Sequence, residues 1–346
     1  MPIPFRIDRK RARLHDPRRE FALTEIESEV RHDPLTGATA RICHLALRTP
    51  PAPDLAAIAA ETARECPFCA PRAERLTPRF PDELVPGGRL RHADAVLFPN
   101  LFPYDDLSAV AVLCAEHFQP MGAMPERLAA NGLALARELT RRAWSPGRGP
   151  AYSLVTWNYM PPAGGTQVHP HMQVIVTTTP GNALVRHLAA EQAFLERCGE
   201  PFAAALLAAE EGGERWIGAR GRVAWLVPFA PTGVLGDAMA VFRERCTLAE
   251  LDDADLADFA AGLSAVLAGF AARGLWSFNL SLLPQAQGAS GRHHWLTARL
   301  LPRLYLNPGL HVSDASYMQL ILGEPFSMVW PEEVAADLRA RFGARG

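Results

Sequence analysis

The chain has 346 residues, of which 49% are hydrophobic and 21% charged, and its formal net charge is −2. This composition suits a well-packed soluble protein made of one large domain or two fused ones. A near-neutral chain has no general attraction to nucleic acid, and no segment is both apolar and long enough to span a bilayer. We therefore expect neither a nucleic-acid partner nor a membrane. The basic run from Arg6 to Arg13 could contact phosphate groups but is interpreted as a solvated arm.

Hydrophobic periodicity predicts two similar series of elements in chain order. The first series has strands near residues 38–47, 92–98, 108–115, 151–158 and 168–178, with helices at 54–64 and 124–143. The second has helical segments at 182–211, strands near 222–228, 236–242, 275–283 and 294–301, and helices at 253–272 and 331–341. This repeated order predicts an α+β protein of two fused units, residues 1–180 and 181–346, each a mainly antiparallel sheet with helices packed on it.

Two of the six cysteines, Cys66 and Cys69, form a Cys-x-x-Cys pair. With no apolar leader behind Met1, the cysteines argue against a secreted disulfide scaffold and predict a reducing, cytoplasmic location. A thioredoxin-like redox pair is one interpretation, but that motif usually opens a helix after a strand, whereas this pair follows a predicted helix. A zinc site is the alternative interpretation.

The most informative motif is His169-Pro170-His171-Met172-Gln173, which precedes a β-like run. Alternate residues of a strand share a face, so His169, His171 and Gln173 would face one cleft. An unprotonated imidazole can attack phosphorus, which makes the motif a candidate for nucleophilic catalysis. A surface pair or half of a metal site is the simpler alternative.

A Gly/Pro-rich segment lies directly upstream, between Asn158 and the motif. The backbone N–H groups near Gly164 and Gly165, together with the Thr166 hydroxyl, could cradle a phosphate beside the histidines. With the histidine motif, this segment resembles the active-site segment of the galactose-1-phosphate uridylyltransferase family, the nucleotidyl-transferring branch of the histidine-triad (HIT) superfamily.

Three further segments carry the same resemblance in the same order, and together they cover roughly residues 30 to 180. They are Asp33-Pro34-Leu35-Thr36-Gly37, Cys66-Pro67-Phe68-Cys69, and Phe98-Pro99-Asn100-Leu101-Phe102-Pro103. The resemblance implies two fused HIT-like units and pairing as a homodimer. It also implies that Cys66, Cys69, His117 and His169 hold a structural Zn²⁺.

The resemblance further assigns roles in the reaction. It implies that His171 is the nucleophile and that Gln173 holds a non-bridging oxygen whose charge grows in the transition state. Gly164, Gly165 and Thr166 would be further phosphate donors. Asn100 and Asn158 would contact the ribose or the base, and Phe98 or Trp157 would pack on the base.

The implied activity is transfer of a nucleoside monophosphate between a nucleotide sugar and a sugar phosphate or another phosphate acceptor, through a covalent nucleotidyl-histidine. Uridine is favoured over adenine. Two alternatives stay open. One is a phosphorylase of the same superfamily, which attacks a dinucleoside polyphosphate or nucleotide sugar with inorganic phosphate. The other, of a different class, is a non-catalytic, zinc-stabilised nucleotide-binding protein.

The chain departs from the family pattern on the sugar side. The family's hexose-binding segment contains a Lys and a Gly-Tyr-Glu, whereas the nearest segment here is Ser316-Tyr317-Met318-Gln319. Arg48 is the only nearby candidate for the family's early arginines. An acceptor other than galactose phosphate is therefore expected.

A second metal site of the family is also not expected. Thr297 and Arg299 stand where the family often has a His-x-His pair, and Arg186 and His187 lie near the place of its acidic partner. His293 and His294 are interpreted as packing or surface residues.

Overall fold

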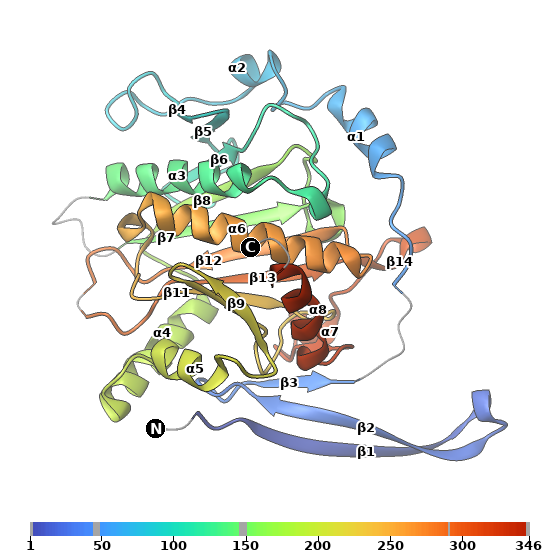
Figure 1. Cartoon of the computed structure of the whole chain (residues 1–346). Coiled ribbons are helices and arrows are strands. Elements are labelled where there is room, and N and C mark those ends of the chain that lie inside the picture. Colours follow the sequence, from blue (N-terminus) through green and yellow to red (C-terminus); the bar gives the residue numbers. More distant parts are fainter. Residues whose placement is uncertain (1–2, 44–48, 145–150, 290, 344–346) are drawn as a thin grey trace.

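One large antiparallel sheet runs through both halves of the chain (Figure 1). The computed structural model describes residues 3–43, 49–144, 151–289 and 291–343. The sheet has ten strands in the order β4 (Leu90–His92), β5 (Ala95–Pro99), β6 (Leu107–Val112), β8 (His171–Thr177), β7 (Tyr152–Tyr159), β12 (Ser277–Leu283), β13 (Thr297–Arg303), β11 (Ala238–Phe242), β10 (Val223–Leu226) and β9 (Trp216–Arg220).

The strand order shows two copies of one unit joined at the middle. Strands β4, β5, β6, β8 and β7 of the first half are repeated by β9, β10, β11, β13 and β12 of the second. Helix α3 (Glu126–Ala143) follows β6, and α6 (Asp253–Ala272) follows β11 at the equivalent point. Antiparallel pairing of β7 with β12 joins the units. The predicted α+β fold of two fused units, each a mainly antiparallel sheet with helices packed on it, is thereby confirmed.

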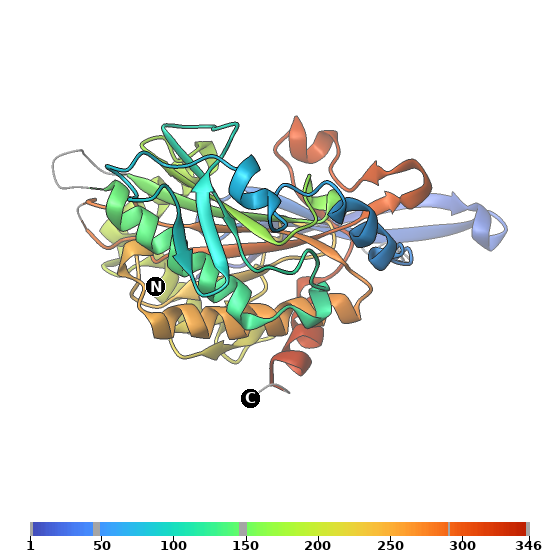
Figure 2. The ribbon, with the colours of Figure 1, turned by 90° about the horizontal axis from the view of Figure 1, so that it is seen from above.

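Helices α3 and α6 cover the same face of the sheet (Figures 1 and 2). Strand β7 explains why, because Val155, Trp157 and Tyr159 alternate toward the helices and are almost fully buried there. Gly132 of α3 has no room for a side chain, since an added Cβ would lie 2.5 Å from the Leu113 Cδ2 atom. This close packing excludes solvent from one face and leaves the opposite face for a binding site.

Helix α6 corrects one expectation from the sequence. By length and composition it could cross a membrane, so the expectation that no segment could do so is wrong. The helix is nevertheless part of the core, because Phe259, Leu263, Val266 and Phe270 are buried between the sheet, α3 and α8 (Pro331–Gly343). A largely buried apolar helix is what the centre of a folded core requires.

A second sheet brings the N-terminal strands to the C-terminal part of the chain. Its order is β1 (Arg6–Asp16), β2 (Ala22–His32), β3 (Thr39–Ile42) and β16 (Phe326–Ser327). Arg31 of β2 donates to Glu332 at the start of α8, over 2.8 Å. The predicted domain boundary near residue 180 stays a prediction, and the N-terminal strands pack against the second half.

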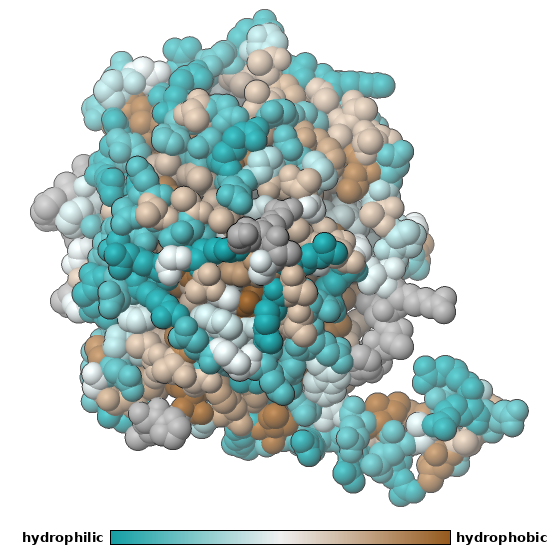
Figure 3. Space-filling view, in the orientation of Figure 1, coloured by the Kyte–Doolittle hydropathy of each residue, from teal (hydrophilic) through white to brown (hydrophobic). Residues whose placement is uncertain are grey.

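Strands β1 and β2 form a long hairpin arm that projects from the body (Figures 1 and 3). The basic run is exposed, as predicted, but it is a regular strand rather than an irregular arm, and β2 was not predicted. Basic side chains of β1 face acidic side chains of β2, as with Arg11 and Glu27 at 3.1 Å. Exposed pairs of this kind contribute little stability, roughly 0 to 1 kcal/mol each.

The remaining elements lie around the sheets. The helices are α1 (Leu55–Ala63), α2 (Arg72–Leu76), α4 (Asn182–Cys198), α5 (Phe202–Glu210) and α7 (Tyr317–Leu320), and the short strands are β14 (Tyr305–Asn307) and β15 (Val312–Ser313). Short 3₁₀ helices are η1 (Pro17–Arg19), η2 (Met121–Ala123), η3 (Pro161–Ala163), η4 (Leu248–Glu250) and η5 (Pro308–Leu310). Of the strand predicted at 38–47, the structure describes β3, and residues 44–48 lie outside the described residues.

Candidate active site and metal centre

The candidate site lies on the sheet face opposite α3 and α6, where the two units meet. Strand pairing sets Gln173 of β8 directly against Thr156 of β7, and Thr156 against Ser281 of β12. Asn158 of β7 lies against Asn279 of β12 in the same way. Directly opposed residues in antiparallel strands share a face, so polar side chains from both units form one surface.

His171 opens β8 on this face, and its hydrogen bonding leaves one ring nitrogen available. Its Nδ1 lies 2.8 Å from the His169 carbonyl oxygen. A carbonyl oxygen only accepts, so Nδ1 carries the proton and Nε2 keeps its lone pair. Burial lowers the pKa of His171, which keeps the ring neutral. The ring of Phe68 packs against it at 5.3 Å between centroids.

The glycine loop upstream is shaped by close backbone contacts. Gly164 has φ +79°, in the left-handed region that favours glycine. A Cβ on Gly165 would lie 2.7 Å from the Asn158 carbonyl oxygen and 3.1 Å from the Met160 carbonyl oxygen. Because the loop folds back tightly between β7 and β8, a side chain at residue 165 would force the loop to shift. Gly164 and Thr166 are exposed on this loop.

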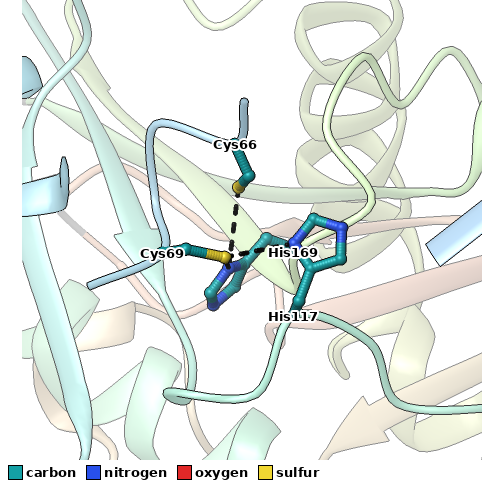
Figure 4. A group of neighbouring side chains, drawn as sticks. All are labelled: Cys66, Cys69, His117 and His169. Carbon is teal, nitrogen blue, oxygen red and sulfur yellow. Dashed lines mark hydrogen bonds between the residues drawn. The ribbon is translucent and has the colours of Figure 1, made fainter. Parts of the chain in front are cut away.

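The four residues predicted to bind zinc converge, although they come from separate segments (Figure 4). Their ligand atoms all lie within 4.8 Å of one another. The His169 Nδ1 atom lies 3.7 Å from the Cys66 Sγ atom and 3.5 Å from that of Cys69, and the His117 Nδ1 atom lies 3.4 Å from Cys69 Sγ. Ordinary Zn–S and Zn–N bonds in a tetrahedron put such S···N edges at about 3.6 Å. The donor set therefore fits Zn²⁺.

Hydrogen bonds on the outer side of both imidazoles support this interpretation. The His169 Nε2 atom donates to the Cys114 carbonyl oxygen over 2.8 Å, and His117 Nε2 lies 2.9 Å from the Thr62 hydroxyl. The Thr62 hydroxyl donates its proton to the Ile58 carbonyl oxygen over 2.7 Å, so it accepts from His117. Both histidines therefore carry the proton on Nε2 and leave Nδ1 free to bind a metal. Burial and the neighbouring Cys66 raise the pKa of Cys69 to about 11, and a bound cation would oppose that rise. Cys66 and Cys69 together with two histidines are typical of a closed structural site.

The residues predicted to contact the nucleotide have different environments. Phe98 lies on the same face as Gln173 through the pairing of β5, β6 and β8, and it packs against Phe68 at 5.8 Å. Asn100 caps a turn, because its Oδ1 accepts from the Phe102 N–H over 3.1 Å. Trp157 is 1% exposed on the helix-covered side, so its predicted contact with the base is wrong.

Several polar residues of the site were not predicted from the sequence. Asn279 and Ser281 of β12 and Arg303 of β13 lie on the site face, and Asn279 donates to the Asn158 side chain over 2.7 Å. Phe68, between the two cysteines, contacts the ring of His171. The one signal in the sequence was that the second series of elements repeats the order of the first. This repeat predicted the strands β12 and β13 but did not identify their polar residues as part of the site.

A second histidine cluster lies in the other unit. His187, Glu191 and His294 bring ligand atoms within 4.8 Å of one another, so they could hold a metal ion. Glu191 of α4 was not singled out in the sequence, and its cluster with the two histidines runs against the expectation that a second metal site is absent. His294 is buried, with Nδ1 bonded to Glu191 and Nε2 2.7 Å from the Leu283 carbonyl oxygen. Burial by itself would raise the pKa of Glu191. Hydrogen bonds from His187 and His294 outweigh that effect, so the pKa is lowered, as it is in a buried ion pair.

The residues compared with the family's sugar-binding groups, 316–319 and Arg48, lie in other segments. Ser316 and Gln319 form a capping box at α7, and Tyr317 is exposed. Arg48 lies outside the described residues.

Comparison with known proteins places this arrangement in a known fold. No protein-family model matches the chain. An uncharacterized protein of Archaeoglobus fulgidus is 28% identical over 311 residues, which cover 90% of this chain and 91% of that protein. An ADP-glucose phosphorylase from Arabidopsis thaliana superposes with a TM-score of 0.70 at 17% identity, over 90% of this chain and 98% of that one.

Two further solved structures agree. A uridylyltransferase superposes with a TM-score of 0.66 at 20% identity, over 91% of this chain and 98% of that one. A GalT-like protein from Arabidopsis thaliana does so with a TM-score of 0.67 at 18% identity, over 90% and 98%. The chain has the GalT-like fold. At these identities the likeness concerns the fold, which carries the histidine motif and the candidate metal site.

Proposed function

We propose that the protein is a nucleotidyltransferase that forms a covalent nucleotidyl-histidine on His171. The observation that carries this proposal is the state of that imidazole. Its Nδ1 is tied to a backbone carbonyl oxygen 2.8 Å away, which leaves the Nε2 lone pair for attack beside Gln173 and the glycine loop. A neutral, oriented imidazole is what nucleophilic attack on phosphorus requires.

The proposed reaction has two in-line displacements. The Nε2 lone pair attacks the α-phosphorus of a nucleotide sugar, an N–P bond forms, and the P–O bond to the distal phosphate breaks with its electron pair. An oxygen of a second phosphate then attacks the same phosphorus, and the N–P electrons return to Nε2. Two inversions give net retention, and ping-pong kinetics follow. The proton on Nδ1 stays in place throughout.

Residues of the site face would stabilise the charge on phosphorus. The Gln173 amide, the Thr166 hydroxyl and the backbone near Gly164 and Gly165 supply donors to the non-bridging oxygens, and Asn158 supplies a further amide. Removing one such donor typically costs about 100-fold or more in rate. Gln173 has no titrating proton to give to a leaving alcohol, so it suits transfer to a phosphate better than hydrolysis.

Zinc would support the site structurally. Held by Cys66, Cys69, His117 and His169, it would link the loop after α1 to the residue two positions before the nucleophile. A bound ion would thereby hold the entry to β8 in place.

The proposed substrates are a nucleotide sugar, with uridine favoured as the base, and a phosphorylated small molecule. An organic group other than galactose is supported by the altered segment at residues 316–319. A cavity of about 340 Å³ lined by Pro161, Trp276 and Tyr305 adjoins the start of the glycine loop. Its aromatic and proline walls support a ring-bearing organic group.

A phosphorylase is the second candidate, because the fold is shared with an ADP-glucose phosphorylase at a TM-score of 0.70. Such an enzyme would use inorganic phosphate in the second displacement. Turnover that depends strictly on inorganic phosphate would select this candidate, and turnover that depends on a sugar phosphate would select the transferase.

We further propose a homodimer located in the cytoplasm. The exposed apolar side chains of Leu320, Ile321 and Leu322 support association with a second copy. A mass of one chain from light scattering at micromolar concentration would overturn the dimer.

Intact-protein mass spectrometry tests the covalent step. The protein is incubated briefly with UDP-glucose, ADP-glucose, GDP-glucose or ATP at mildly alkaline pH, where phosphoramidates survive. We expect a gain of one nucleotidyl group that is absent from His171→Gly and present in His92→Gly, a matched change on the exposed strand β4. No adduct from any donor, with nucleotide binding intact, would instead indicate the non-catalytic nucleotide-binding protein.

A further inference from the structure

A line of hydrogen-bonded side chains crosses from the second unit into the first and ends at Asn158. Asp314 accepts from the Arg303 Nε at 2.9 Å and 2.8 Å through its two carboxylate oxygens. The Arg303 Nη1 donates to the Asn279 Oδ1 over 2.5 Å, and the Asn279 Nδ2 donates to the Asn158 Oδ1 over 2.7 Å. We call Asp314, Arg303, Asn279 and Asn158 the relay.

The chemistry of the relay fixes the orientation of both amides. A guanidinium group only donates, so the oxygen of Asn279 must face Arg303. The Asn279 Nδ2 then has two hydrogens for two acceptors, the Asn158 Oδ1 and the Ala163 carbonyl oxygen at 2.8 Å. A flipped Asn279 would set its oxygen against the Asn158 oxygen and its nitrogen against the guanidinium, and a flipped Asn158 would set its nitrogen against the Asn279 nitrogen. Only one arrangement satisfies all of these groups.

This arrangement determines which end of Asn158 a substrate meets. Its Oδ1 is taken by Asn279, so its two amide N–H groups are the end available for a ligand. Asn158 is the next residue on the site face after Thr156, which pairs with Gln173, and so lies toward the His171 end of β8. N–H donors at that position match the non-bridging oxygens of a phosphoryl group, which accept hydrogen bonds.

The relay also reaches the glycine loop. Ala163, whose carbonyl oxygen accepts from Asn279, directly precedes Gly164. One amide of β12 therefore holds both Asn158 and the start of the loop that lies beside the nucleophile. At the outer end the Asp314 side chain is buried, at 3% exposed, and that of Arg303 is partly buried, at 21%.

We propose that Asn279 and Arg303 are positioning residues for nucleotidyl transfer. They act from the second unit by holding the amide N–H groups of Asn158 toward the phosphoryl group bound at His171. The inference rests on the proposed function, since it assigns these residues to the same reaction. Neither touches the reacting atoms, and their effect passes through Asn158 and the glycine loop.

Substitution of Asn279 by Asp separates positioning from folding. The variant Asn279→Asp keeps an acceptor for Arg303 and nearly the same shape, but its carboxylate cannot donate to Asn158. Asn158 then turns its own N–H groups toward residue 279 and presents its oxygen to the phosphate. We expect adduct formation in single turnover to slow about 100-fold, the typical effect of one transition-state donor, while the midpoint of thermal unfolding stays close to that of the wild type.

A double-mutant cycle provides a readout that a merely structural role would not move. If Asn279 acts through Asn158, then Asn279→Asp should add much less than 100-fold in an Asn158→Ala background, because coupled residues are not additive. Full additivity of the two rate effects would overturn the relay.

A matched ion pair controls for general loss of a buried carboxylate. Arg245 and Asp255 have side-chain exposures of 22% and 1%, close to those of Arg303 and Asp314, and they lie at the start of α6 away from the site. We expect Asp314→Asn to slow adduct formation at least tenfold more than Asp255→Asn. Equal effects of the two changes would show that the pair at Arg303 has no special role.

The outcomes distinguish this inference from the proposed function. If the wild type forms an adduct and Asn279→Asp forms it at the same rate, the relay is overturned while the covalent mechanism stands. If the wild type forms no adduct, the covalent mechanism fails. The affinity for UDP and ADP, measured by calorimetry, then tests whether the relay positions Asn158. Weaker binding by about tenfold in Asn279→Asp supports it, and unchanged binding overturns it.

Discussion

Asp237 is the residue for which the structure makes the sharpest prediction about stability. It is fully buried just before β11, where one oxygen accepts from Arg299 at 3.3 Å and from the Thr232 N–H at 3.2 Å. The other oxygen, Oδ1, has no hydrogen-bond partner among the described residues. Burial raises the pKa of Asp237 from 3.8 to about 6, against the opposing effect of Arg299. The folded protein therefore binds this proton more tightly than the unfolded chain.

The size of the effect follows from linkage between protonation and folding. Because the folded pKa is raised, stability is lost as pH rises from the unfolded value, and the full cost applies above the folded value. A shift from 3.8 to about 6, at 1.36 kcal/mol for each unit, corresponds to about 3 kcal/mol at pH 8. About half of this, roughly 1.4 kcal/mol, develops between pH 5 and pH 8.

The variant Asp237→Asn removes this titration, so it should lose less stability between the two pH values than the wild type. Urea unfolding at pH 5 and pH 8 measures the difference, with the exposed Asp106→Asn as a control for a change of charge alone. We expect the free energy of unfolding of the wild type to fall by about 1.4 kcal/mol more than that of Asp237→Asn. Equal changes in both proteins would refute the argument from burial.

Three further predictions concern the site and the core. Gly165→Ala should slow adduct formation about 100-fold with the fold intact, because its Cβ would displace the loop from the Asn158 carbonyl oxygen; rates like the wild type would contradict this. Cys69→Ser should lower the zinc content found by elemental analysis by one ion per chain and lower the unfolding temperature, and unchanged zinc content would exclude the proposed ligand set. Asp252→Ala should destabilise the protein by about 1 kcal/mol in urea unfolding, since Asp252 caps α6; no loss would mean that its capping box contributes little.

The agreement between sequence and structure is best where chemistry is local. Histidine and glutamine at alternate positions predicted a strand with His171 and Gln173 on one face, and both lie there in β8. His169 departs from that pattern, because it precedes the strand and turns toward the cysteines. Periodicity likewise predicted α3 and α6, whose apolar positions face the sheet.

The failures have physical reasons of their own. The hairpin arm was missed because its strands carry charged residues on an exposed face, where no alternation with a core is imposed. Trp157 was placed against the base by its neighbours in sequence, but the pleat of β7 turns it to the opposite side from Asn158.

What the sequence by itself determined is the repeated α+β unit and the chemically distinctive groups, since hydrophobic periodicity and short motifs act over a few residues. What only the tertiary structure decided is which distant groups meet. Asn158 and Asn279 are 121 residues apart and form one hydrogen bond, and Glu191 and His294 are 103 residues apart. Such pairs carry no local signal, because each partner's contacts arise only when the sheet brings the two units side by side.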